Sequence, residues 1–238
     1  MAAINFVLVH GAWHGGWCWG RVRPLLERSG HRVLTPTQTG LGERAHLMSP
    51  DIDLTLFAED IARVLIMEEL TDIVLVGHSF AGAAISAVAD RMPDRLGSLV
   101  YLDALVIESG ETPISRNPPD VAAQRIKASQ EFDGGLSMPV PPPSAFGVTR
   151  PEDVAWIAGR LTPHPLKTFM SSLTLNNPVG NGVPATYIAC TDPWYGPLAS
   201  SRERAREFGW PMREIATGHD AMVTAPEQLA ALLIEIAG

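Results

Sequence analysis

A short apolar segment that runs directly into Gly-His-Ser constrains the fold of this 238-residue chain more than any other feature. Residues 72–76 have the composition of a buried strand, and Gly77-His78-Ser79 leads through Phe80 into a small-residue stretch typical of a helix. A strand that turns sharply through Gly-x-Ser into a helix holds the serine strained and exposed at the strand's carboxyl end. The sequence therefore predicts Ser79 as a nucleophile, which requires a nearby base and an oxyanion hole.

Short β-branched segments alternate with longer amphipathic ones along the chain, which is typical of a parallel sheet covered by helices on both faces. The length allows one large core, so we expect a single α/β domain. Six strands are predicted, at residues 4–10, 32–37, 72–77, 98–103, 185–191 and 212–217.

Residues 104–184 interrupt this alternation with a proline-rich stretch followed by short helical patterns. An insertion of this length between two strands usually has a function or is disordered. We predict that residues 1–103 and 185–238 form the core and that residues 104–184 form a helical cap. The cap would cover the carboxyl ends of the strands, where open α/β sheets bind ligands. The alternative is a peripheral lobe that contributes to no pocket.

The candidate base is His219, in a loop between the last predicted strand and the last predicted helix. The candidate acid that orients its imidazole is Asp192, which follows strand 185–191, and the rival is Asp103, at the end of strand 98–103. We expect Asp192 to be the acid. Of the other histidines, we expect His31, His46 and His164 to be solvated, and His10 and His78 to be structural or pocket-lining.

The oxyanion hole requires two backbone N–H groups aimed at one point. We expect one from Phe80, directly after the nucleophile, and one from Ala12 in the glycine-containing loop 10–17. That loop lacks both G-x-G-x-x-G and the Walker spacing, so the sequence predicts no nucleotide cofactor. The two cysteines, Cys18 and Cys190, have no metal-binding spacing and are expected to be reduced thiols in the cytoplasm.

The net charge of −8 at pH 7 and a pI near 5.3 argue against nucleic acid as a partner. No apolar run approaches the roughly 20 residues that a membrane span needs, and the first residues do not resemble a signal peptide. These features leave a small molecule as the expected partner.

Three segments together resemble the α/β-hydrolase fold, and more narrowly the branch of plant methyl esterases, hydroxynitrile lyases and small bacterial esterases. They are residues 9–19 (VHGAWHGGWCW), 76–79 (VGHS) and 218–222 (GHDAM). The resemblance implies a parallel sheet of about six strands, a mobile cap, no cofactor and often a homodimer. It also implies the chain order nucleophile, acid, base. Two departures are Ala81, where the elbow usually has glycine, and the spacing around Asp192, which is one residue short and keeps Asp103 open.

Esterase and lyase differ at two positions in this branch. Lyases similar to this chain carry threonine and lysine where this sequence has Gly11 and Asp220, so an esterase is favoured. We predict a serine hydrolase that cleaves a small to medium apolar or aryl carboxylic ester through an acyl-enzyme. The alternatives are a carbamate, amide or lactone hydrolase, a hydroxynitrile lyase, and a non-catalytic binding protein. The candidate pocket residues are Trp13, Phe80, Trp156, Phe169 and Met222.

Overall fold

The computed structural model describes residues 3–238, and a six-stranded, wholly parallel sheet lies at its centre. Its strand order is β2-β1-β3-β4-β7-β8, which confirms the predicted sheet. The strands are β1 (Asn5–Val9), β2 (Arg32–Leu34), β3 (Ile73–His78), β4 (Leu96–Leu102), β7 (Ala185–Cys190) and β8 (Met212–Ile215). The sheet places the carboxyl ends of β1, β3 and β4 side by side.

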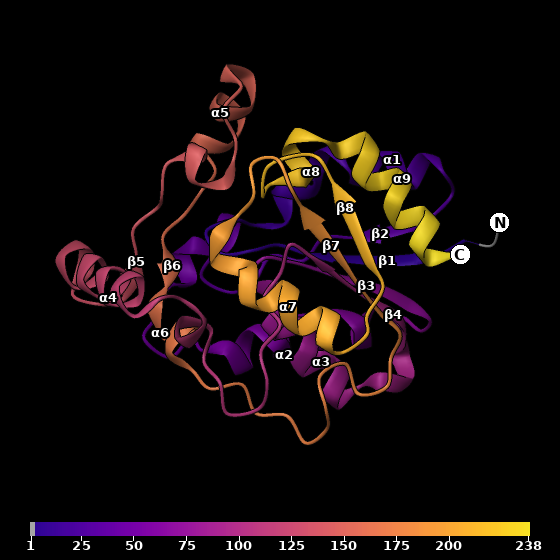
Figure 1. Ribbon diagram of the computed structural model, residues 1–238, viewed down its shortest axis with the longest axis horizontal. Coiled ribbons are helices and arrows are strands. Elements are labelled where there is room, and N and C mark those ends of the chain that lie inside the picture. The colour runs from indigo at the N-terminus through magenta and orange to yellow at the C-terminus, as the bar shows by residue number, and fades with distance from the viewer. Residues whose placement is uncertain (1–2) are drawn as a thin grey trace.

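Helices cover both faces of the sheet, as the alternating pattern predicted. Figure 1 shows α1 and α9 on one side and α2, α3 and α7 on the other. The helices of the core are α1 (Arg23–Arg28), α2 (Leu54–Met67), α3 (Ala81–Arg91), α7 (Ala199–Glu207), α8 (Ala221–Thr224) and α9 (Pro226–Ala237). The short 3-10 helices here are η1 (Gly16–Arg21), η2 (Gly42–Leu47), η3 (Pro93–Arg95) and η6 (Gly196–Leu198).

The central strands are apolar on both faces because both are packed against helices. Every residue of β3 is buried, and α3 approaches the sheet closely because its first turn, residues 81–84, consists of alanine and glycine. A Cβ at Gly82 would lie only 2.1 Å from the carbonyl oxygen of Leu105, so glycine is required at this position. The small residues therefore bring the start of α3 tightly against the chain that leaves β4.

Residues 104–184 connect β4 to β7 and form a separate group of elements beside the sheet, seen on the left of Figure 1. The insertion contacts the loop after β1, because the backbone N–H of Thr162 donates to the carbonyl of Trp13 (3.0 Å). Its two short strands pair antiparallel. The elements are η4 (Pro113–Arg116), α4 (Pro119–Asp133), β5 (Ser137–Met138), η5 (Pro143–Phe146), α5 (Pro151–Ala158), β6 (His164–Pro165) and α6 (Leu166–Met170).

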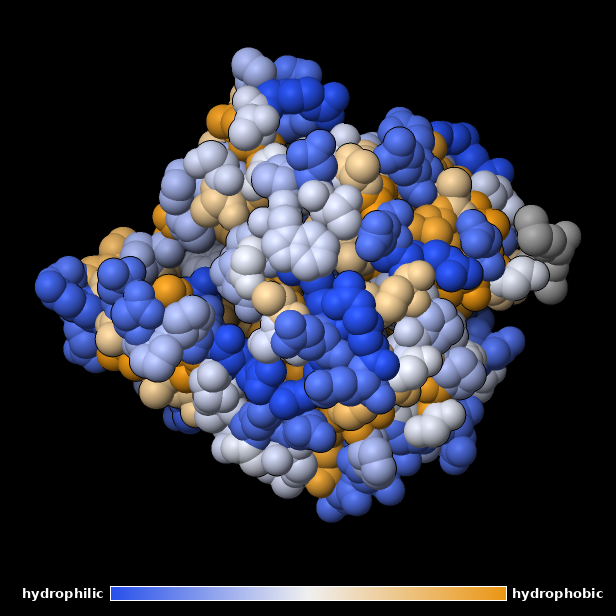
Figure 2. Space-filling view, in the orientation of Figure 1, coloured by the Kyte–Doolittle hydropathy of each residue, from blue (hydrophilic) through white to orange (hydrophobic). Residues whose placement is uncertain are grey.

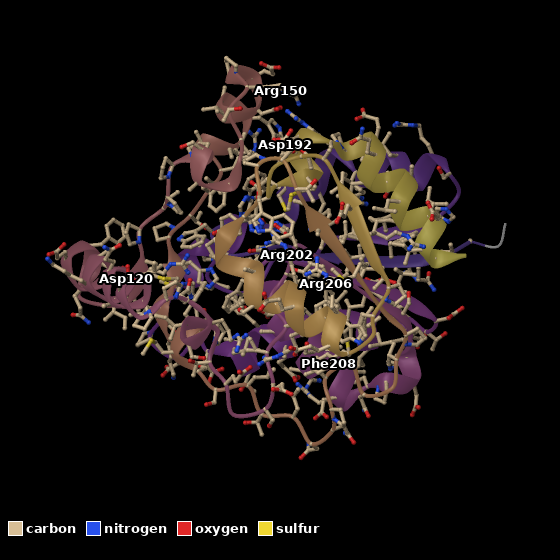
Figure 3. All side chains as sticks on the ribbon, in the orientation of Figure 1. Asp120, Arg150, Asp192, Arg202, Arg206 and Phe208 are labelled. Carbon is tan, nitrogen blue, oxygen red and sulfur yellow. The ribbon has the colours of Figure 1, made fainter. Side chains whose placement is uncertain are left out.

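The outer face of α7 is hydrophilic and lies at the centre of the view in Figure 2. Arg206 on this helix is exposed, whereas Arg202 one turn earlier is fully buried. Figure 3 labels both side chains on the helix. A buried arginine needs a partner, and Arg202 finds its partner in the candidate site.

Candidate active site

Ser79 lies in a strained turn between β3 and α3. Its φ is +55°, a left-handed conformation that residues other than glycine seldom adopt. Its carbonyl accepts hydrogen bonds from the backbone N–H groups of Gly82 (3.2 Å) and Leu105 (2.9 Å), which hold the turn. Ala81, at the position where the elbow usually has glycine, is fully buried, and the turn still forms. The geometry presents the Ser79 hydroxyl at the carboxyl end of the sheet.

The imidazole of His219 lies between Ser79 and a carboxylate. The Ser79 hydroxyl donates to Nε2 of His219 (2.8 Å), and Nδ1–H donates to Oδ2 of Asp103 (2.7 Å). His219 is only 2% exposed, and the ring of Tyr195 stacks on it at a centroid distance of 4.0 Å. The tautomer follows from these bonds, because Nδ1–H donates to the carboxylate and Nε2 is left to accept. This chain of hydrogen bonds has the geometry of a base poised to take the serine proton.

The structure brings Asp103, not Asp192, to His219, so the preference for Asp192 is corrected. Asp192 is exposed in the loop after β7 (Figure 3), and within residues 3–238 its carboxylate makes no hydrogen bond or ion pair. The reason is strand order, since β4 is the direct neighbour of β3 while β7 lies one strand further away. A side chain at the end of β4 therefore stands closer to Ser79.

Asp103 has a second partner that no sequence pattern predicted. Its Oδ1 accepts a hydrogen bond from Nη2 of Arg202 (2.6 Å), and both side chains are fully buried. The guanidinium also donates to the carbonyl of Tyr195 (2.8 Å) and lies 3.7 Å from the ring centre of Trp194. The carboxylate is thus held between a histidine and an arginine.

The loop after β1 places the backbone of Ala12 beside Ser79. Ala12, Ser79 and Phe80 line the same small pocket of about 30 Å³. Within the described residues, the backbone N–H groups of Ala12 and Phe80 make no hydrogen bond to another protein group. Gly11 allows the close approach, because a Cβ there would lie 2.8 Å from the Cβ of Ser79. Both predicted donors are therefore free to bind an oxygen in this pocket.

A buried ion pair ties this loop to the segment that carries His219. Nδ1 of His14 contacts the carbonyl of Ala12 (2.8 Å), and Nε2 contacts Oδ2 of Asp220 (3.0 Å). Two acceptors require both nitrogens to carry protons, so His14 is an imidazolium. Burial alone would lower the pKa of His14, but the Asp220 carboxylate outweighs it and raises this pKa. The pair fixes the Ala12 backbone relative to His219.

The remaining histidines are mostly buried, which corrects the expectation that His31 and His164 are solvated. His31 is 6% exposed and His164 is fully buried, whereas His46 is exposed as expected. Nδ1 of His164 accepts from the backbone N–H of Trp13 (3.2 Å), which links the insertion to the site. His10 and His78 are buried, in line with a structural role.

Three of the five candidate pocket residues line the pocket at Ser79, namely Trp13, Phe80 and Phe169. Trp156 and Met222 do not. Trp156 packs edge-on against Trp17, and Met222 is fully buried in the core. The sequence reasoning missed the other lining residues because no local motif marks them. They are Leu105, Pro113, Asn117, Arg125, Tyr195, Pro197 and Leu198.

Among residues 3–238, no group of three or more histidine, cysteine or acidic side chains is placed to hold a metal ion. Over the same residues, no helix is both long and apolar enough to cross a bilayer. Cys18 and Cys190 are buried free thiols.

Comparison with known proteins gives the family and a set of relatives. The sequence profile described as the alpha/beta hydrolase family matches residues 6–232. The carbendazim hydrolyzing esterase of Nocardioides sp. (strain SG-4G) is 39% identical over 95% of this chain and 96% of its own length. Methylesterase 3 of Arabidopsis thaliana is 30% identical over 98% of this chain and 95% of its own.

A solved structure shows the same fold along the whole chain. An extracellular alpha/beta-hydrolase from a Paenibacillus species superposes with a TM-score of 0.86, covering 99% of each chain at 23% identity. The shared architecture includes the six-stranded parallel sheet with helices on both faces.

Proposed function

Since this chain belongs to the alpha/beta hydrolase family and is an ester hydrolase of its methylesterase branch, we propose that Ser79 is its nucleophile. The observation that carries the proposal is the continuous hydrogen bonding from Ser79 through His219 to Asp103, with distances of 2.8 and 2.7 Å. Serine is a weak nucleophile until an adjacent base takes its proton, and this arrangement supplies the base and its orienting acid.

In the proposed mechanism, Oγ of Ser79 attacks the ester carbonyl carbon while Nε2 of His219 takes the hydroxyl proton. The carbonyl oxygen becomes an oxyanion that the N–H groups of Ala12 and Phe80 stabilise. His219 then gives the proton to the leaving alcohol, which departs as the C–O bond breaks and leaves an acyl-Ser79. A water molecule, deprotonated by His219, attacks the acyl carbon. The bond from that carbon to Oγ of Ser79 then breaks, His219 returns the proton to Oγ, and the carboxylic acid leaves. Asp103 remains ionised and orients the imidazole throughout.

Residues 104–184 act as a cap in this proposal. Arg125 and Phe169 of the insertion line the pocket at Ser79 together with core residues such as Ala12 and Phe80. Apolar side chains dominate that wall, which suits an alkyl or aryl ester. Substitutions in the cap would therefore change the substrate preference without changing the reacting groups.

Carbamate hydrolysis is the second candidate. One relative is named a carbendazim hydrolyzing esterase, and carbendazim is a carbamate. The same serine, base and oxyanion donors can attack a carbamate carbonyl. A hydroxynitrile lyase is disfavoured, because the acidic Asp220 stands where similar lyases have lysine, and its carboxylate is committed to His14.

The deciding experiment compares hydrolysis of p-nitrophenyl acetate, butyrate and octanoate by the wild type and by Ser79→Ala. We expect the variant to lose at least ~10³-fold in kcat/KM, in line with removal of a nucleophile that acts with its base as a unit. Hydrolysis of carbendazim by the same two proteins tests the second candidate. Equal, feeble rates for both proteins on every ester and carbamate would refute the assignment of Ser79.

A further inference from the structure

A second cavity adjoins the small pocket at Ser79. Its volume is about 260 Å³, against about 30 Å³ for the pocket at the serine. The two cavities share Trp13, Arg125 and Tyr195 in their walls. The rest of the larger cavity is apolar and comes from the insertion, with Met138, Phe146 and residues 139–141 in its lining. The three shared side chains place the larger cavity directly beside the reaction site.

Arg125 is the one charged side chain in the lining of either cavity. It lies on α4 and is half-buried, with its guanidinium carbon 5.9 Å from the ring centre of Trp13 and 5.6 Å from that of Phe169. No carboxylate lies within ion-pair distance of it anywhere in residues 3–238, although most other arginines around the site are paired. The side chain of Tyr195 lines both cavities beside it.

A cation in this setting is incompletely satisfied. A guanidinium has five N–H donors, and within residues 3–238 those of Arg125 have no carboxylate partner. The faces of Trp13 and Phe169 hold the group in position by cation–π contacts, but they do not replace a hydrogen-bond acceptor. The apolar walls lower the local dielectric constant around the half-buried guanidinium, which strengthens a charge pair formed there. The Arg125 guanidinium is therefore positioned to bind an anionic group of a ligand.

Resting on the proposed ester hydrolysis, we propose that the larger cavity holds the part of the substrate remote from the reacting carbonyl, and that Arg125 binds a carboxylate on that part. The substrate class is a half-ester: an apolar chain or ring with an ester group at one end and a free carboxylate at the other. A planar guanidinium fits a carboxylate through two parallel hydrogen bonds. The methylene or aryl body of such a molecule packs on Met138, Phe146 and the prolines.

Matched pairs of esters test this assignment. Monomethyl and dimethyl succinate, glutarate and adipate differ within each pair in one charge and vary across pairs in length. We expect the wild type to prefer the anionic member by at least ~10-fold in kcat/KM at one or more lengths, in line with a charge-assisted bond. Arg125→Met should abolish that preference, with the loss in kcat/KM falling on the anionic member of each pair and arising through KM. Arg125→Lys should retain part of it.

Arg160→Met is the matched control, because Arg160 is an exposed arginine outside both cavities and its loss changes the net charge equally. It should leave the preference intact. The proposal is overturned if the wild type prefers no anionic ester at any length, or if Arg125→Met slows both members of each pair alike. Calorimetric binding of monomethyl adipate to Ser79→Ala, with and without Arg125→Met, tests the cavity without catalysis. If no ester is hydrolysed, the proposed function fails while this binding result still decides the role of Arg125.

Discussion

Arg202 donates a hydrogen bond of 2.6 Å to Asp103, and neither side chain is exposed to solvent. The same carboxylate accepts a bond from His219, so one buried anion is shared between the imidazole and a permanent cation. The guanidinium compensates the charge that Asp103 must carry in a site closed to water. The pair therefore joins the stability of the fold to the geometry of the proposed catalytic groups.

Replacing Arg202 by methionine should destabilise the protein by about 3–5 kcal/mol, because it leaves a buried carboxylate with less compensation. Urea unfolding of Arg202→Met measures this loss. In Asp103→Asn/Arg202→Met the uncompensated charge is gone, so the double variant should be more stable than the sum of the single changes predicts. If the losses in unfolding free energy of the two single variants add up to that of the double variant, the two side chains are not energetically coupled.

Asp103 and Asp192 can be separated by parallel substitutions. Asp103→Asn should reduce kcat by about 10⁴-fold, because an amide no longer holds His219 in the required tautomer. Asp192→Asn should remain near the wild type, since its side chain is exposed and makes no polar contact in the described residues. Initial rates with p-nitrophenyl butyrate, with circular dichroism to verify folding, give the comparison. The reverse ranking would restore Asp192 as the acid.

The difference between these two residues shows what sequence patterns can predict in this fold. Local sequence patterns predicted the strands, the Ser79 turn and the position of His219, because each depends on a few neighbouring residues. The choice of acid depends on which strand lies beside β3, and the sequence does not carry that information locally. The chain order gave no help, because Asp103 and Asp192 both lie between Ser79 and His219.

The pocket lining was hard to predict for a similar reason. Aromatic residues are suitable both for a pocket and for a core, and only packing decides, as Trp156 and Met222 show. Arg125 comes from the insertion and Tyr195 from the loop after β7, and neither segment has a recognisable motif. Their roles follow from tertiary contacts alone.

Gly11 should tolerate no side chain without loss of activity. A Cβ at this position would lie 2.8 Å from the Cβ of Ser79 and 2.9 Å from Nδ1 of His78, so the loop with Ala12 must move away. Displacing one oxyanion donor costs about 3 kcal/mol of barrier, or roughly 100-fold in kcat. We expect a loss of this size in Gly11→Ala and a larger one in Gly11→Thr.

Gly159→Ala is the control for this prediction, because a Cβ at Gly159 would meet nothing within 4 Å. Its kcat should match that of the wild type. Assays with p-nitrophenyl acetate and, for cyanide release, with mandelonitrile would follow all three variants. A Gly11→Thr protein with unchanged esterase rates would contradict the proposed position of the Ala12 donor.

The buried histidines should make the protein sensitive to mild acid. Burial lowers the pKa of His10 from 6.5 to about 3, and burial also lowers the pKa of His78 and His164 well below 6.5. The hydrogen bonds agree, since one ring nitrogen of His10 and one of His164 accept from backbone N–H groups and cannot carry a proton. The unfolded chain therefore binds more protons than the folded one below about pH 6.5.

His10, His78 and His164 make their full contribution to the free energy of unfolding above about pH 6.5. Below that pH, each contribution falls by about 1.4 kcal/mol per pH unit. His14 acts in the opposite direction, because its pKa is raised in the folded state and its contribution is lost only as the pH rises. The net expectation is a decrease of about 3 kcal/mol in unfolding free energy between pH 7.5 and 5.5, measured by urea denaturation. His164→Gln should reduce this slope, whereas His46→Gln, at an exposed site, should not. A stability that stays level down to pH 5.5 would mean that the buried imidazoles bind protons in the folded protein.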